Sequence, residues 1–397
     1  MTLPETIKQE TDTLFPEVVQ HYRHLHQHPE LSHQEKETNA YITAFLDAEG
    51  IPYRNNVGRY GILAHVKGEG FDSERTIAFC ADMDALPIQE ENEVPYKSDN
   101  PKVMHACGHD AQVASLMGAA KLINQYRTEF GGAVLFVFQP AEEQSPGGAE
   151  MMLKDDVFRD FNPEFIVKQH AYVDLPAGKV AFQTGTIMAS ADEVHIQVKG
   201  RGGHGALPHE LNDTVLAASN IIIAMQQIVS RRGNPFYPMV LSFGKFIADG
   251  ATNVIPDVVT LAGSLRCMIE HERQKMLEII PQIATSTAEA YGCTCEVTLP
   301  EGYPCTISNE KITEEVKNAA IRLVGEKNVT DFPKRMTADD FGFFTAKYDA
   351  CYYRFGVAGK KNRGKLHTST FLIDEESLRV STGLFTLFAV ETMQQQR

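Results

Sequence analysis

The sequence contains no run of basic residues. Its 37 lysines and arginines stand against 52 aspartates and glutamates, which gives a formal net charge of −15 over 397 residues. An acidic surface repels phosphate backbones and anionic lipid headgroups. We therefore expect no nucleic acid and no membrane among its partners, and a small molecule as its ligand.

Long apolar segments are also missing. No stretch of about 18 apolar residues occurs, the length that a transmembrane helix needs. The first residues, MTLPETIKQETDTLF, lack a basic segment followed by an apolar one, as a secretory signal would have. The seven cysteines are an odd number and favour reduced thiols over a disulfide framework. These features predict a cytoplasmic protein.

The length predicts two domains, because single cores stop growing at about 250–300 residues. Over residues 1–186, short β-branched or aromatic runs such as TIAFC and AVLFVF alternate with helical stretches. This alternation indicates an α/β domain with a mixed, largely parallel sheet. Residues 301–397 add a strand and two helices, too little to stand alone, so we expect them to complete the same catalytic domain.

Residues 187–300 show a different pattern, in which strands and helices follow in the order β-α-β-β-α-β. This order is that of a ferredoxin-like α+β unit. The sequence therefore predicts a second domain inserted into the first.

Polar residues gather where the predicted strands end. Asp82 and Asp84 follow TIAFC, the pair Glu142–Glu143 follows AVLFVF, and His170 follows FIVKQ. In open α/β sheets the ligand site forms at the carboxyl ends of the strands. We expect these side chains to share one rim of the sheet.

The loop Cys107-Gly108-His109 places a thiol and an imidazole two residues apart, just before a predicted helix. Around a flexible glycine, both side chains can converge on one ion. Sulfur, nitrogen and oxygen donors together disfavour Mg²⁺ and Ca²⁺ and suit Zn²⁺, Mn²⁺, Co²⁺ or Ni²⁺. An acidic pair at the end of an apolar strand also calls for a cation, and one carboxylate can ligate while the other transfers protons.

With these residues in view, the sequence resembles the M20 metallopeptidase family, and within it the amidohydrolase branch of hippurate hydrolases, auxin-conjugate hydrolases and N-acetyldiaminopimelate deacetylases. Eight motifs in order carry the resemblance over nearly the whole chain. They are HLHQHPELSHQEKET (24–38), ADMDALPIQE (81–90), MHACGHDA (104–111), QPAEE (139–143), GGHGALPH (202–209), NVIPD (253–257), TADDF (337–341) and LHTSTF (366–371). The sequence departs from the family pattern at Cys80, where arginine is usual, and at Gln112, Thr337 and Asp339.

The resemblance implies a centre of two divalent ions per subunit, since five protein ligands exceed the needs of one catalytic zinc. Cys107 would bridge the ions, and Glu142 would act as general base on a metal-bound water and then protonate the leaving nitrogen. Asp84 would orient a ligand imidazole. The implied ligands are Cys107, His109, Glu143, His170 and His367.

The resemblance also implies a homodimer formed through the inserted lid domain. His204 would reach the active site of the partner subunit and donate a hydrogen bond to the developing oxyanion. Asn253 and Arg266 would hold the substrate carboxylate.

The leading hypothesis is an amidohydrolase that cleaves N-acyl-amino acids. A dipeptidase or carboxypeptidase on the same scaffold is the nearest alternative, because both need the same attack of water on an amide. A non-catalytic metal-dependent ligand-binding protein is the alternative of another class, and it predicts loss of Glu142 or His204. Both residues are present.

Overall fold

A computed structural model describes residues 1–359 and 364–395 of the chain. The chain forms two compact units. Unit 1 comprises Met1–Gly185, Ile307–Pro333 and Phe343–Arg397, and unit 2 comprises Thr186–Thr306 and Lys334–Gly342. The segment Lys334–Gly342, expected in the catalytic domain, groups with unit 2, where the backbones of residues 335 and 337 bond to residues 187 and 189. The catalytic and lid roles of the domains stay predictions.

A mixed, largely parallel sheet forms the centre of unit 1, in the order β1-β2-β4-β3-β5-β16-β6-β15. β3 runs parallel to β4 and β5, and β16 runs parallel to β5, whereas β2 is antiparallel to its neighbours. β3 and β4 are buried at every residue, which suits their continuous apolar runs. The predicted α/β class is confirmed. The strands are β1 (Tyr53–Val57), β2 (Gly61–Lys67), β3 (Thr76–Asp82), β4 (Ala133–Gln139), β5 (Phe165–Pro176), β6 (Val180–Phe182), β15 (Val329–Asp331) and β16 (Asp349–Ala358).

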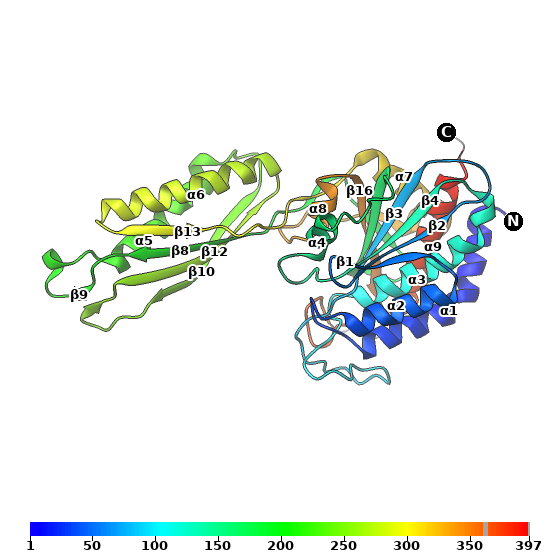
Figure 1. Cartoon of the computed structure of the whole chain (residues 1–397), viewed down its shortest axis with the longest axis horizontal. Coiled ribbons are helices and arrows are strands. Elements are labelled where there is room, and N and C mark those ends of the chain that lie inside the picture. The colour runs from blue at the N-terminus through cyan, green and yellow to red at the C-terminus, as the bar shows by residue number, and fades with distance from the viewer. Residues whose placement is uncertain (360–363, 396–397) are drawn as a thin grey trace. The chain divides into compact units, whose positions relative to one another are not determined.

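Helices α3 and α9 pack on this sheet, and α1 packs against both of them (Figure 1). α3 is rich in alanine, glycine and serine and is buried almost throughout, because small side chains let it lie between the sheet and α1. The helices are α1 (Leu3–Gln27), α2 (Lys36–Ala48), α3 (His109–Gln125), α4 (Gly148–Lys154), α7 (Glu310–Val324), α8 (Gly342–Thr345) and α9 (Ser377–Met393), with short 3₁₀ turns at Arg127–Glu129 and Glu326–Asn328.

Unit 2 has the predicted element order β-α-β-β-α-β. Its antiparallel sheet runs β10-β12-β8-β13, and α5 and α6 cover one face of it (Figure 1). The first helix of this unit is α-helical to Gln227 and ends in a π-helical turn, Ile228–Arg232. The elements are β8 (Asp192–Lys199), β9 (Gly203–His204), α5 (Thr214–Gln227), β10 (Met239–Ala248), β11 (Val254–Ile255), β12 (Val258–Cys267), α6 (Glu270–Ala290) and β13 (Thr294–Thr298), with a 3₁₀ turn at Pro208–Glu210. Short strands β7 (Gly185–Met188) and β14 (Thr306–Ser308) lie where the chain passes between the units.

Among the described helices, none combines the length and the apolar character that crossing a bilayer requires.

Candidate metal centre

The candidate residues of unit 1 lie along one rim of its sheet, where β3 ends at Asp82 and β4 ends at Gln139. The sequence predicts that the strand before His170 ends at this rim, but β5 continues past His170. β5 continues to Pro176 because β16 keeps pairing with it, with Arg354 opposite His170. Pairing between β5 and β3 stops at Lys168, however, so His170 still stands at the edge.

The loop before α3 presents Cys107 and His109. Gly108 between them has a left-handed backbone (φ 85°), so the two side chains converge through a turn around the glycine, as expected. A β-carbon on Gly108 would also lie 2.9 Å from the Ala171 Cβ. Glycine is therefore required twice here, for its conformation and for its size.

Donor atoms of five side chains form overlapping groups around Cys107. Its Sγ lies 3.3 Å from His170 Nε2 and 3.4 Å from His367 Nε2. His367 Nε2 in turn lies 3.3 Å from Glu143 Oε1. The donor atoms of Cys107, His109 and His170 all lie within 4.8 Å of one another, and so do those of Cys107, Glu143 and His367. Cys107 is thus shared by two three-residue groups, as a bridging ligand would be.

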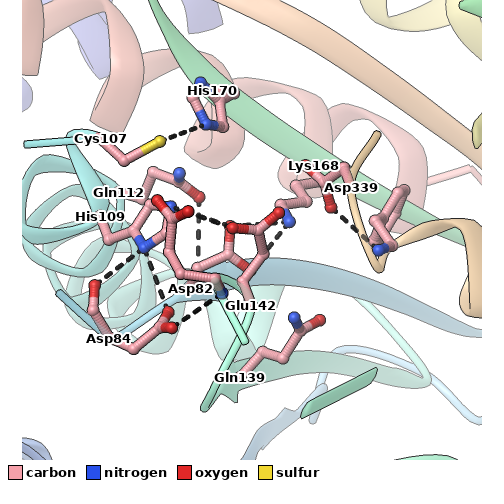
Figure 2. A network of polar contacts seen from close by, with 12 residues as sticks. Asp82, Asp84, Cys107, His109, Gln112, Gln139, Glu142, Lys168, His170 and Asp339 are labelled. Atoms are coloured by element: carbon pink, nitrogen blue, oxygen red, sulfur yellow. Dashed lines mark hydrogen bonds and ion pairs between the residues drawn. The ribbon is translucent and has the colours of Figure 1, made fainter. Parts of the chain in front are cut away.

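His109 is held by Asp84. Its Nδ1 donates to the Asp84 carbonyl oxygen at 2.9 Å and lies 3.2 Å from Asp84 Oδ1 (Figure 2). Burial alone would raise the pKa of Asp84, but hydrogen bonds from His109 and Ser32 lower it to about 2. Asp84 is therefore ionised and fixes the ring of His109 so that Nε2 faces the donor group.

Three observations fit a metal in this cluster. His109 Nε2 is buried and has no hydrogen-bond partner among residues 1–359 and 364–395, an arrangement that costs free energy unless the nitrogen binds a ligand. Burial, with the charge of Glu143 adding to it, raises the pKa of the Cys107 thiol, so ionisation of this thiol calls for a nearby cation. Burial lowers the pKa of His170, which keeps its imidazole neutral, as metal ligation requires.

His367 arrives from the loop after β16. Its backbone is left-handed (φ 61°), and its N–H donates to the Ala106 carbonyl at 2.8 Å. This bond ties the loop of His367 to the loop of Cys107. The His367 side chain is about half exposed, so the cluster opens to solvent on its side.

A buried ion pair that was not predicted from the sequence lies next to His109. Lys168 Nζ lies 2.7 Å from Asp82 Oδ2, and both side chains are fully buried. Asp82 Oδ2 is in turn 3.8 Å from His109 Nε2. Lys168 stands opposite Cys80 in the β3–β5 register, so the cation near Asp82 comes from β5. A lysine inside the apolar run FIVKQH was the signal that could have shown it.

A second buried network was also missed, behind the first turn of α3. His26 Nδ1 lies 2.6 Å from Asp110 Oδ2, and its Nε2 lies 3.1 Å from Glu90 Oε1. Burial alone would lower the pKa of His26, but these two carboxylates raise it to about 9. The histidine-rich segment 21–33 thus contains one charged structural histidine.

Three predicted residues belong to unit 2, and the structure brings only two of them together. His204 pairs with Val254 across β9 and β11, which sets it beside Asn253, and both are exposed. Arg266 lies near the other end of β12, eight residues beyond Val258. At about 3.3 Å per residue, Arg266 is roughly 26 Å along the strand from Val258.

Comparisons with known proteins agree with this geometry. The family model described as "Peptidase family M20/M25/M40" matches residues 78–391. The chain belongs to this family. As a member, it is a metal-dependent hydrolase that acts on amide bonds, and the resemblance seen in its motifs is confirmed.

Individual relatives of this M20 protein cover nearly its whole length. YhaA of Bacillus subtilis (strain 168) is 38% identical over 90% of the chain and 89% of its own length. The N-acetyldiaminopimelate deacetylase of Enterococcus faecalis is 35% identical (94% of each chain), and thermostable carboxypeptidase 2 of Saccharolobus solfataricus is 33% identical (98% and 99%). Among solved structures, the YXEP protein of Bacillus subtilis, described as a dinuclear metal binding peptidase from the M20 family, aligns with a TM-score of 0.82 at 31% identity and covers 96% of this chain and 99% of its own.

Proposed function

We propose that this M20 protein hydrolyses the amide bond of N-acyl-amino acids, releasing a carboxylic acid and an amino acid. The observation that carries the proposal is the placement of Glu142, a largely buried carboxylate whose Oε2 lies 3.9 Å from His109 Nε2, beside the donor groups that share Cys107. A carboxylate that is next to a metal cluster but is not needed as a ligand is suited to proton transfer.

We propose Cys107, His109, Glu143, His170 and His367 as ligands of two divalent ions, Zn²⁺ or Mn²⁺, with Co²⁺ or Ni²⁺ as substitutes. The ions would supply Lewis-acid activation of water and of the amide carbonyl. Glu142 takes a proton from the attacking water, and the carbonyl carbon gains the new C–O bond. The same carboxyl group then gives its proton to the amide nitrogen as the C–N bond breaks.

The geometry of His204 suits an oxyanion donor. Its Nδ1 accepts a hydrogen bond from the backbone N–H of Ala206 at 3.1 Å, so the proton sits on Nε2, which is free to donate. We propose that His204 donates to the developing oxyanion and that Asn253 and Arg266 hold the substrate carboxylate. His204 and Asn253 lie at β9 and β11, just before β12 begins at Val258, whereas Arg266 lies roughly 26 Å further along β12. We therefore propose that one substrate meets Arg266 of one subunit and His204 of the partner subunit.

If Arg266 and His204 of one site come from two subunits, the protein is a homodimer that pairs through unit 2. The surface of unit 2 supports this proposal. β10 is an edge strand, and it exposes Phe246 and Ile247, while α5 exposes Leu216 and Ile223. Exposed apolar residues on an open strand edge favour pairing with another chain. Light scattering should show a dimer, and Ile247→Asp should shift it to monomer.

A dipeptidase or carboxypeptidase is the second candidate, and the relative named a carboxypeptidase supports it. The two functions share the proposed proton transfers and differ in the group on the acyl side. We propose the cytoplasm as the compartment for either.

A substrate panel separates the candidates. Metal-loaded enzyme should hydrolyse N-acetyl- or N-benzoyl-amino acids faster than plain dipeptides, as measured by amino-acid release. Glu142→Gln should lose at least about 100-fold in kcat, because general acid–base catalysis contributes on that order. Gln144→Ala, at an exposed position of the same loop, is the matched control and should keep full activity. Faster turnover of dipeptides would favour the second candidate, and an unimpaired Glu142→Gln would refute the role of Glu142.

A further inference from the structure

Two buried carboxylates bracket the residue proposed as general base. The backbone N–H of Ala141 donates to Glu35 Oε1 at 2.8 Å, and the N–H of Glu143 donates to Asp84 Oδ2 at 2.9 Å. Glu142 lies between these two bonds. Its position is therefore set by its neighbours on both sides, and both anchors come from distant segments of the chain.

The Glu35 anchor also holds strained backbone. Ala141 has φ 49°, and His33, whose N–H donates to the same oxygen of Glu35 at 3.0 Å, has φ 65°. Non-glycine residues in this left-handed region are strained and persist where surrounding contacts enforce them. One carboxylate oxygen thus stabilises two strained residues, one of which directly precedes Glu142.

Capping of helix α2 does not explain the contacts of the Glu35 side chain. It occupies the N-cap position of α2, yet its side chain makes no capping hydrogen bond. The first N–H groups of α2 are bound instead by Glu30, which accepts from Glu37 and from Thr38. Glu35 is fully buried and directs its carboxyl group away from its own helix, to residue 141.

We propose that Glu35 is a positioning residue for the reaction: through the Ala141 backbone it fixes the conformation in which Glu142 transfers protons. This inference rests on the proposed function, since it needs Glu142 as the base. Glu35 itself does not contact the reacting atoms.

The second oxygen of Glu35 indicates which substitution should preserve the role. Oε2 is buried and has no hydrogen-bond partner within the described residues, and burial raises the pKa of Glu35 to about 7. A glutamine has the same shape and keeps an acceptor oxygen for Ala141 and His33. Alanine removes that acceptor and leaves both N–H groups buried without it.

The test compares Glu35→Ala, Glu35→Gln and the matched control Glu30→Ala, which loses a similar set of backbone bonds at α2 but none to the Glu142 loop. Glu35→Ala should lower kcat about 10- to 100-fold with KM and the content of bound metal unchanged, since small misplacements of a catalytic group cost this much. Glu35→Gln should recover most of kcat. Glu30→Ala should lower thermal stability and leave kcat near wild type.

A double variant separates positioning from a general loss of structure. If Glu35 acts through Glu142, then Glu35→Ala combined with Glu142→Gln should be no slower than Glu142→Gln alone. Multiplying losses, or a Glu35→Ala enzyme with wild-type kcat, would overturn the inference while leaving the general base intact.

An inactive wild-type enzyme, or a fully active Glu142→Gln, would instead refute the proposed function. In that case, crystal structures of the wild type and Glu35→Ala decide the positioning claim. The claim predicts a displaced 140–143 loop in the variant, and an unmoved loop would refute it.

Discussion

Replacing Lys168 by methionine should strongly destabilise unit 1. The lysine ammonium lies 2.7 Å from Asp82 Oδ2, and both side chains are 0% exposed. Solvent water therefore cannot replace the ammonium group as the partner of the Asp82 carboxylate. The weaker contact of Asp82 to His109 Nε2, at 3.8 Å, stays. Breaking a fully buried ion pair by removing one partner costs about 3–5 kcal/mol. We expect a loss of this size in the free energy of unfolding.

Urea titration of the metal-free protein, followed by circular dichroism, measures this loss. Lys317→Met is the matched control in the same unit, because Lys317 pairs with an Asp331 side chain that is 76% exposed, and its removal should cost less than about 1 kcal/mol. Adding Asp82→Asn to Lys168→Met should restore at least about 1 kcal/mol, because the two groups interact directly. Equal, small losses for Lys168→Met and Lys317→Met would refute the reasoning.

Two further changes test other parts of the structure. Because the pKa of His26 is about 9 in the folded protein and about 6.5 when unfolded, its protonated form stabilises the fold. The stability difference between wild type and His26→Gln should be largest below about pH 6.5, at about 3 kcal/mol, and should decline as the pH rises to about 9; a difference that grows with pH would contradict the network. Gly148→Ala should displace the Glu142 loop, since its Cβ would meet the Pro140 carbonyl oxygen at 1.6 Å. It should lower the unfolding free energy by about 1–3 kcal/mol and should also lower kcat, whereas Gly244→Ala, with open space around it, should do neither.

Much of the fold could be read from hydrophobic patterning. The continuous apolar runs of β3 and β4 and the β-α-β-β-α-β order of unit 2 are local signals, and the structure confirms them. Strand order is not local. The insertion of an antiparallel β2 beside β4 and the extension of β5 to Pro176 depend on pairing partners distant in the sequence.

The site shows the same division. Cys107, His109, Glu143 and Glu142 lie in short motifs whose chemistry is visible in the sequence, and the structure places their side chains together. Glu35 and Lys168 contact residues 106 and 86 positions away, so no spacing in the sequence indicates these partners, although the apolar run FIVKQH marks Lys168 as a buried lysine. Their roles follow only from burial and hydrogen-bond partners.

The most direct test of the central claim is a metal titration of the stripped enzyme during hydrolysis of an N-acyl-amino acid from the panel. The account predicts no turnover without metal and a rate that rises with added Zn²⁺ or Mn²⁺ until two ions are bound per chain. Turnover by the metal-free chain, or full activity with no metal bound to the Cys107 cluster, would contradict it.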